Sequence, residues 1–336
     1  MNFKFSTTVL AFLSAVLASA TTPSYTITDL GTLGYSSDGY GLNNLGVAVG
    51  QSNVSAYVAD AFSWTSTGGM INLGKLSGSS GAAQAYAIND SNLAVGWCYN
   101  SSGDQRPCFW SGGGITEIMV GAGNAYAYAV NNLGHMLGRD PNGHPFFYSG
   151  GTITDLYMAG MSSGDMAYAI NDSDEIAGSG PNGPCILKGG VEYSIGNLGR
   201  TNGRAKGINY SGQVVGISTL TNWMSRAFIW TPKSACGTSG TMVNLGVLGS
   251  GDASIACGLN DWGDVVGQSN TTAGGNYVAY VAMRDGTSYQ LYDLNSCVPG
   301  LTGWTLGVAN SINDSGCIVG IGRYGGYDHA FLLTPI

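Results

Sequence analysis

The chain has 336 residues, with 12 Lys or Arg against 20 Asp or Glu and a net charge of −8. This acidic balance argues against nucleic acids and anionic membranes as partners, because both bind basic protein surfaces. Charged residues make up only 10% of the chain, whereas 55 residues are glycine, a composition typical of strands and turns rather than helices.

Residues 1–20 combine Lys4, a short apolar run over residues 9–16 and the small residues Ala18-Ser19-Ala20. This pattern predicts a secretory signal peptide cleaved after Ala20, since the apolar run is too short to anchor the chain in a bilayer. No later stretch is long and apolar enough to span a membrane, and residues 333–336 carry no anchoring tail. We therefore expect a secreted, extracellular monomer whose mature part, residues 21–336, is one domain.

A short pattern recurs seven times, for example as Ala85-Tyr-Ala-Ile-Asn-Asp-Ser-Asn-Leu-Ala-Val-Gly96. An aliphatic residue precedes each repeated asparagine, a Gly, Asn or Asp follows three positions later, and a glycine follows seven positions later. Gly, Asn and Asp tolerate positive φ, so the pattern predicts strand, tight turn and strand, with the asparagine capping the turn rather than binding a ligand. The repeated asparagines are Asn43, Asn89, Asn131, Asn171, Asn209, Asn260 and Asn313.

Each repeat contains four strand-like segments, except that the seventh lacks the fourth. The missing segment is matched by residues 25–30 near the N-terminus, Tyr-Thr-Ile-Thr-Asp-Leu. A first strand that completes the last repeat closes a ring and removes open sheet edges. The asparagines lie 38 (171 to 209) to 53 (260 to 313) residues apart, which suits a four-stranded blade. We predict an all-β fold, a single seven-bladed β-propeller closed by residues 25–30, in preference to an open β-solenoid.

The same motifs resemble those of the extracellular HAF repeat family. They are Asp29-Leu-Gly-Thr-Leu-Gly34, Gly-Ile-Asn at 207–209, Val-Val-Gly at 214–216 and His329-Ala-Phe331. The resemblance covers residues 25–333, and the tripeptide that names the family is intact only at 329–331. It implies a secreted repeat protein and no single activity, so function has to be argued from the site.

The seven cysteines of a secreted chain are expected to include disulfides, and Cys98 and Cys108, which flank one loop, are the predicted pair. No CxxC or Cys/His cluster suggests a metal, and we expect no cofactor. The sequons at Asn53, Asn100 and Asn270 fall in predicted long loops and are the candidate glycosylation sites.

Functional residues are expected on the face formed by the long, variable connections from the second to the third strand and from the fourth strand to the next repeat. The residue before each third strand should approach the mouth of the central channel, and in chain order these residues are Asp60, Arg106, His144, Gly183, Arg226, Val278 and His329. Nearby loops add Arg139, Arg323, Tyr324, Tyr327, Trp97, Trp223 and Tyr277. An alternative is that the position before the third strand is only a polar start position, capped by local backbone.

Three functions remain open. In the leading one the loop face binds extracellular carbohydrate, because Arg binds carboxylates bidentately and aromatic faces stack on sugars. The ligand-binding residues would then be Asp60, Arg106, Arg139, Arg323, Tyr324, Trp97, Trp223 and Tyr277. In the second the protein is a polysaccharide lyase or glycoside hydrolase with His329, His144, Arg226 and Tyr327 as catalytic residues that neutralise a carboxylate and transfer a proton. The third is a protein-interaction module.

Overall fold

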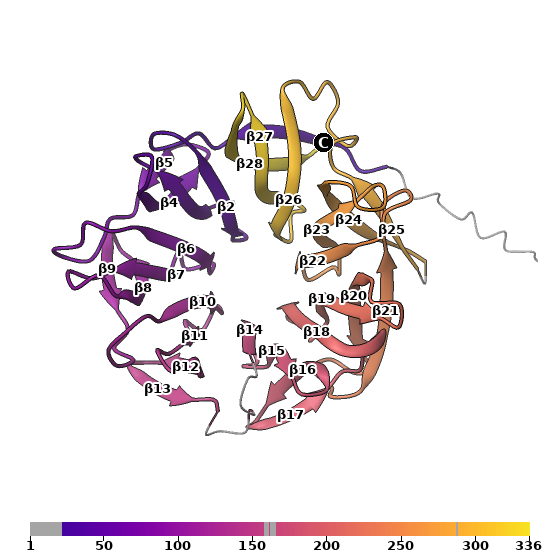
Figure 1. Cartoon of the computed structure of the whole chain (residues 1–336), viewed down its shortest axis with the longest axis horizontal. Helices are drawn as coiled ribbons and strands as arrows, with labels where there is room; N and C mark the ends of the chain where they lie inside the picture. The colour runs from indigo at the N-terminus through magenta and orange to yellow at the C-terminus, as the bar shows by residue number, and fades with distance from the viewer. Residues whose placement is uncertain (1–21, 158–160, 162–165, 287) are drawn as a thin grey trace, which may run out of the picture.

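The computed structural model describes residues 22–157, 161, 166–286 and 288–336. The predicted signal peptide lies outside these residues. The described chain forms seven four-stranded antiparallel sheets around a central axis, as the blades of a β-propeller (Figure 1). In each blade the strand that ends before the repeated asparagine is innermost, and the other three follow outward.

The first four blades occupy the N-terminal half of the ring. Their strands are β2 (Ser37–Leu42), β3 (Ala48–Asn53), β4 (Ala59–Thr65) and β5 (Gly69–Asn72), then β6 (Ala83–Ile88), β7 (Ala94–Tyr99), β8 (Gln105–Ser111) and β9 (Gly114–Glu117), then β10 (Tyr126–Val130), β11 (Met136–Arg139), β12 (Pro145–Ser149) and β13 (Thr152–Asp155), and finally β14 (Met166–Ile170), β15 (Ile176–Gly180), β16 (Gly183–Lys188) and β17 (Val191–Ser194).

The remaining three blades complete the ring, with β1 as the outermost strand of the last. Their strands are β18 (Gly199–Ile208), β19 (Val214–Leu220), β20 (Ser225–Pro232) and β21 (Gly240–Gly246), then β22 (Ser254–Leu259), β23 (Val265–Asn270), β24 (Tyr277–Asp285) and β25 (Ser288–Asp293), and finally β26 (Trp304–Ile312), β27 (Ile318–Tyr324), β28 (Tyr327–Pro335) and β1 (Tyr25–Asp29).

The ring is closed by an N-terminal strand, as predicted. β1 pairs antiparallel with β28 in a register that runs from Tyr25 opposite Pro335 to Asp29 opposite Phe331. The first and last parts of the chain therefore share one sheet (Figure 1), and no blade is left with three strands. This pairing confirms the seven-bladed propeller.

The tight turn after each innermost strand has the predicted left-handed residue. Three positions after the asparagine φ is positive at every repeat, including two non-glycine residues, Asn92 (60°) and Asp174 (58°). The glycine seven positions after the asparagine has a steric role instead. A Cβ on Gly96 would overlap the carbonyl oxygen of Gln84 on the innermost strand, and the equivalent glycines are as closely packed.

The hydrophobic core lies between the blades. Leu42 and Phe62 of the first blade pack with Val319, Ala330 and Leu332 of the last blade in one cluster of buried side chains. Small residues on the innermost strands allow neighbouring blades to lie close together near the axis, where space is limited. Each blade therefore depends on its neighbours for burial, as expected of stacked repeats.

Two features predicted for an extracellular chain differ from the structure. No disulfide links the seven cysteines, all of which lie among the described residues. Cys98 and Cys108 are buried on adjacent strands, but Cys98 lies opposite Arg106 and Cys108 opposite Gly96, so the two thiols are not directly paired. Asn53 and Asn270 are the last residues of β3 and β23, and Asn270 is only 3% exposed, so neither is the loop sequon that we expected. Nothing in the described chain forms a helix that could cross a bilayer.

Candidate functional site

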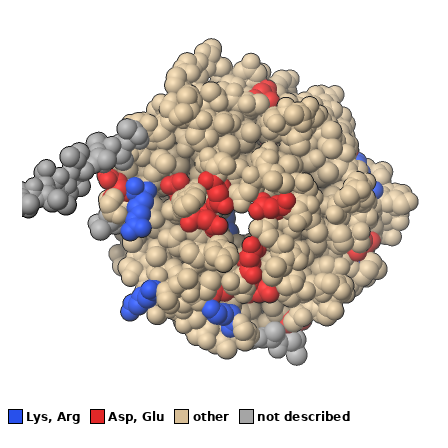
Figure 2. Space-filling view, turned by 180° about the vertical axis from the view of Figure 1, so that it is seen from behind, with Lys and Arg blue, Asp and Glu red and all other residues tan. Residues whose placement is uncertain are grey.

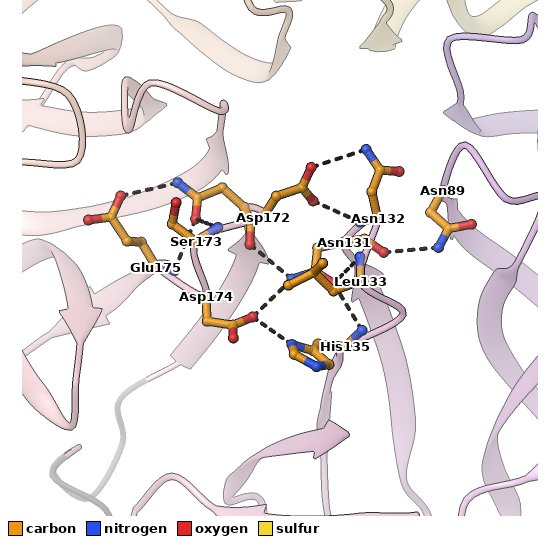
Figure 3. A network of polar contacts seen from close by, with 10 residues as sticks. Asn89, Asn131, Asn132, Leu133, His135, Asp172, Ser173, Asp174 and Glu175 are labelled. Carbon is orange, nitrogen blue, oxygen red and sulfur yellow. Dashed lines mark hydrogen bonds and ion pairs between the residues drawn. The ribbon is translucent and has the colours of Figure 1, made fainter. Parts of the chain in front are cut away.

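The repeated asparagines form a continuous hydrogen-bonded ring around the axis. Each side chain is buried, and its Oδ1 accepts backbone N–H groups of its own turn, such as Leu133 N (3.1 Å) and His135 N (2.9 Å) at Asn131. This confirms the predicted caps. Each Nδ2 also donates to the carbonyl oxygen of the asparagine in the next blade, as Asn89 does to Asn131 at 2.9 Å (Figure 3). The bond from Asn313 to Asn43 (3.1 Å) completes the circle.

A second ring lies next to the first, one residue further along each turn. Its backbone N–H groups donate to the side-chain oxygen of the neighbouring blade, for example Asn132 N to Asp172 Oδ1 at 2.8 Å (Figure 3). Six of the seven junctions have this bond. The junction from Asp172 to the next blade differs because Tyr210 has no short acceptor at that position. The residues of this ring are Asn44, Asp90, Asn132, Asp172, Tyr210, Asp261 and Asp314.

The two rings surround one mouth of the central channel, a hollow of about 280 Å³. Figure 2 shows acidic side chains gathered around this central opening. Burial raises the pKa of Asp261, and the carboxylates of Asp314, Asp172 and Asp90 raise it further. The charges of this acidic mouth therefore repel each other across the opening. No group of three or more His, Cys, Asp or Glu in the described chain is arranged to hold a metal ion.

The innermost strands carry a second set of partly exposed residues, three positions before each asparagine. Buried small residues such as Ala85 and Ala127 alternate with them. Four of the seven are tyrosines, and they come from consecutive blades, so one side of the channel is aromatic. In chain order the residues are Tyr40, Tyr86, Tyr128, Tyr168, Lys206, Cys257 and Asn310.

Tyr40 and Tyr86 begin a polar and aromatic network between the first two blades. Their ring centroids are 5.5 Å apart. Tyr86 Oη donates to Gln84 Oε1 at 2.7 Å, and Trp97 Nε1 donates to both Gln84 Oε1 (3.2 Å) and Tyr86 Oη (3.1 Å). Trp97 is only 5% exposed. It therefore positions Gln84 and Tyr86 rather than offering an open loop surface, as its sequence position had suggested.

The network continues to a carboxylate. Gln84 Nε2 hydrogen-bonds to Gln51 Oε1, and Gln51 Nε2 donates to Asp38 Oδ2 at 2.6 Å. Tyr40 Oη donates to the same carboxylate oxygen at 3.3 Å. Burial raises the pKa of Asp38, and burial also raises the pKa of Tyr40 well above its usual range, with Asp38 contributing. The channel wall thus combines aromatic rings, amides and a carboxylate in a poorly hydrated place.

The residues before the third strands do not meet at the channel mouth, contrary to prediction. They lie on the third strand of their sheets, or just before it in the case of His144, so two strands separate them from the axis. The polar contacts of the charged ones involve the outermost strand or the loop beyond it. Asp60 is bound by Lys75 Nζ (2.5 Å) and Asn72 Nδ2 (2.8 Å). Arg106 donates to Glu117 Oε1 (2.6 Å) and to Gly123 O (3.0 Å). These contacts fit the alternative of a polar start position.

The two histidines predicted to be catalytic lie in separate blades, each beside an aspartate. His144 Nδ1 is 3.4 Å from Asp155 Oδ2, and its ring stacks on Tyr157 with centroids 4.6 Å apart. His329 Nδ1 is 3.0 Å from Asp29 Oδ1. Each histidine has a carboxylate partner, and among the described residues the two histidines contact no residue in common.

His329 belongs to an aromatic cluster on the last blade. Tyr324 stacks on Trp304 at 4.8 Å between centroids, and both rings meet the His329 ring edge-on. Tyr327 lies opposite Tyr324 across the hairpin and is exposed. This cluster is the largest grouping of predicted site residues that the structure brings together.

The predicted arginines bind nearby backbone. Arg139 Nε donates to Gly143 O (2.9 Å) and Arg323 to Gly326 O (3.1 Å). Arg226 donates to Ser225 O (3.0 Å) and to Asp252 O.

The last two predicted aromatics are exposed and lie in different blades. Trp223 lies under the guanidinium of Arg200, 3.5 Å from the ring centroid, and Tyr277 is the first residue of β24. Neither is among the contacts of the channel network.

No protein-family model and no curated protein sequence matches this chain. Two solved structures share the fold. The extracellular domain of the putative hybrid two component system BT4673 from B. thetaiotaomicron is 12% identical with a TM-score of 0.56, and the match covers 92% of this chain but only 39% of that domain's length. YCF48 from Cyanidioschyzon merolae is 10% identical with a TM-score of 0.54, and the match covers 92% of this chain and 98% of that one. At these identities the likeness concerns the propeller architecture alone.

Proposed function

We propose that this chain is a secreted propeller that binds extracellular carbohydrate at the aromatic side of its central channel. The proposed extracellular location rests on the signal peptide predicted in residues 1–20 and on the resemblance to extracellular HAF repeat proteins. The binding role rests on one observation, the network that joins Asp38, Gln51 and Gln84 to the ring pair of Tyr40 and Tyr86.

The chemistry of this network suits sugars. Aromatic rings pack against the C–H faces of pyranose rings, while amides and carboxylates hydrogen-bond to hydroxyl groups. Binding sites typically combine apolar lining with a few fixed polar groups, and here Trp97 fixes Gln84 and Tyr86 from behind. Side chains held in this way lose little conformational entropy when a ligand binds.

Binding is favoured over catalysis by the separation of the acid–base candidates. An acid–base mechanism needs proton-transfer groups within hydrogen-bond reach of one substrate. His144 and His329 are on different blades and each contacts an aspartate of its own sheet. The enzyme alternative therefore lacks a shared site, whereas the binding proposal has one.

The test is affinity electrophoresis of the mature protein through gels that contain neutral or acidic polysaccharides, with Tyr40→Ala and Gln84→Ala as site variants. We expect each variant to lose at least about tenfold in affinity, or about 1.4 kcal/mol. Tyr324→Ala is the matched control, since it removes an aromatic ring from the last blade. Retardation lost in Tyr324→Ala but kept in both site variants would place the ligand on the last blade and refute the channel site. Release of fragments, detected by mass spectrometry, would establish the enzyme alternative.

A further inference from the structure

The basic residues of this chain are few and nearly all have partners. Of the 12 Lys and Arg, 11 lie among the described residues. Eight of these bind a carboxylate, a carbonyl oxygen or an aromatic ring. In the described part of the chain, the side chains of Arg204, Lys206 and Lys233 have no hydrogen bond or ion pair. Lys233 is exposed outside the sheets, whereas Arg204, which is also exposed, and the half-buried Lys206 lie on an innermost strand.

Arg204 and Lys206 both lie on β18, the innermost strand of the fifth blade. They stand five and three positions before Asn209. In the first blade the equivalent positions are those of Asp38 and Tyr40, so the two cations border the channel at the level of the network. Burial raises the pKa of Cys257 on the innermost strand of the next blade, and the nearby charge of Lys206 lowers it. Figure 2 also shows a small patch of basic atoms inside the central opening.

Two unpaired cations beside a channel attract an anion. A charge without a protein partner has an electrostatic interaction left to make, and guanidinium and ammonium groups bind carboxylates and sulfates. We infer that the carbohydrate of the proposed function carries a carboxylate or sulfate group that Arg204 and Lys206 bind within the channel. This inference rests on the proposed function and adds the charge class of the ligand.

The direction of access follows from the same charges. The acidic mouth carries Asp90, Asp172, Asp261 and Asp314, which repel a polyanion. A polyanionic ligand therefore reaches Arg204 and Lys206 from the opposite opening, where the second and fourth strands of each blade end. Tyrosines of the first four blades then face one side of the sugar while the fifth blade binds its charge.

The experiment is isothermal titration calorimetry with an oligogalacturonate, its fully methyl-esterified form and a sulfated dextran oligomer of similar length. Arg204→Gln and Lys206→Gln are the site variants, and Lys233→Gln is the control that makes the same change in net charge outside the channel. We expect each site variant to lose about tenfold or more in affinity for an acidic oligomer. Affinity of the control should stay at the wild-type value, and all three variants should keep the wild-type unfolding temperature.

The outcomes separate the two proposals. Preference for either acidic oligomer over the ester, lost in Arg204→Gln and partly restored in Arg204→Lys, supports the inference, and the stronger of the two ligands identifies carboxylate or sulfate. Equal binding of the acidic and esterified oligomers by wild type and variants alike overturns the inference and leaves carbohydrate binding standing. Absence of binding by any oligosaccharide refutes both.

Discussion

Replacing Asn131 by alanine should reduce stability several times more than a typical surface substitution does. The side chain is buried and makes four hydrogen bonds, to Leu133 N (3.1 Å), His135 N (2.9 Å), Asn171 O (3.0 Å) and Asp174 Oδ1 (2.9 Å). At about 1 kcal/mol for each net hydrogen bond, the loss is about 4 kcal/mol in the free energy of unfolding. Equilibrium denaturation in urea, with the slope held common between variants, measures this difference.

An aspartate at the same position separates the cap from the link between blades. Asn131→Asp keeps an oxygen for the turn but loses the Nδ2 donor and brings a carboxylate against Asp174 (Figure 3). Asn89→Asp loses only the bond to the Asn131 carbonyl and meets no carboxylate there. We expect Asn131→Asp to be the more destabilising of the two at neutral pH, and the gap to narrow at acid pH as the carboxylates protonate.

Asn142→Ala is the control, because this exposed asparagine makes one side-chain bond, to Asp140 at 3.2 Å, and its loss should stay within about 0.5 kcal/mol. The ring would be refuted as a link between blades if Asn131→Ala cost no more than Asn142→Ala, or if both aspartate variants were equally stable at every pH.

Three further predictions concern closure, packing and charge. Gly96→Ala should destabilise the fold by about 2–4 kcal/mol, since the added Cβ would overlap the Gln84 carbonyl. Gly114→Ala should change stability little in the same urea titration, because its Cβ would meet only the Ser111 carbonyl oxygen at 3.7 Å, an ordinary van der Waals contact. Deleting residues 22–30 removes β1, so size-exclusion chromatography should show association through the β28 edge, and a monomer as stable as the full chain would contradict ring closure. Asp261→Asn should raise the unfolding temperature at neutral pH and low salt, because the pKa of Asp261 is raised in the folded protein. Protonated Asp261 contributes stability that is fully present below the pKa of the unfolded state. This contribution is lost as pH rises through the pKa of the folded state, so the charged carboxylate destabilises the fold at neutral pH. The effect should vanish below about pH 4, and persistence there would contradict the charge argument.

The architecture was predictable because the pattern of strand, tight turn and strand recurs seven times in the sequence. Residues 25–30 could be recognised as the missing fourth strand since they copy a pattern present in six other places, and the positive φ at Asn92 and Asp174 follows from residue types that tolerate it. The Asx caps also followed from local chemistry. The sequence around one turn does not say where the next blade lies. The hydrogen bond from each Nδ2 to the asparagine carbonyl oxygen of the next blade could therefore not be predicted.

The candidate site was harder to predict because charge was a misleading signal. His144, Arg106 and Asp60 drew attention as rare charges in a chain poor in them, yet they are paired within their own blades. The signal that would have found the network was the tyrosine three positions before the asparagine, shared by four consecutive repeats. A tyrosine repeated at this regular spacing suggests a structural role. Only the closed ring places these tyrosines together beside the channel.

Hydrogen exchange of the mature protein, measured with and without an acidic oligosaccharide, tests whether the ligand binds in the central channel. We expect the ligand to slow exchange on the innermost strands β2, β6 and β18, which border the network and the unpaired cations. Slowing confined to the hairpin of β27 and β28, or to any other outer loops, with β2, β6 and β18 unchanged, would contradict a binding site in the channel.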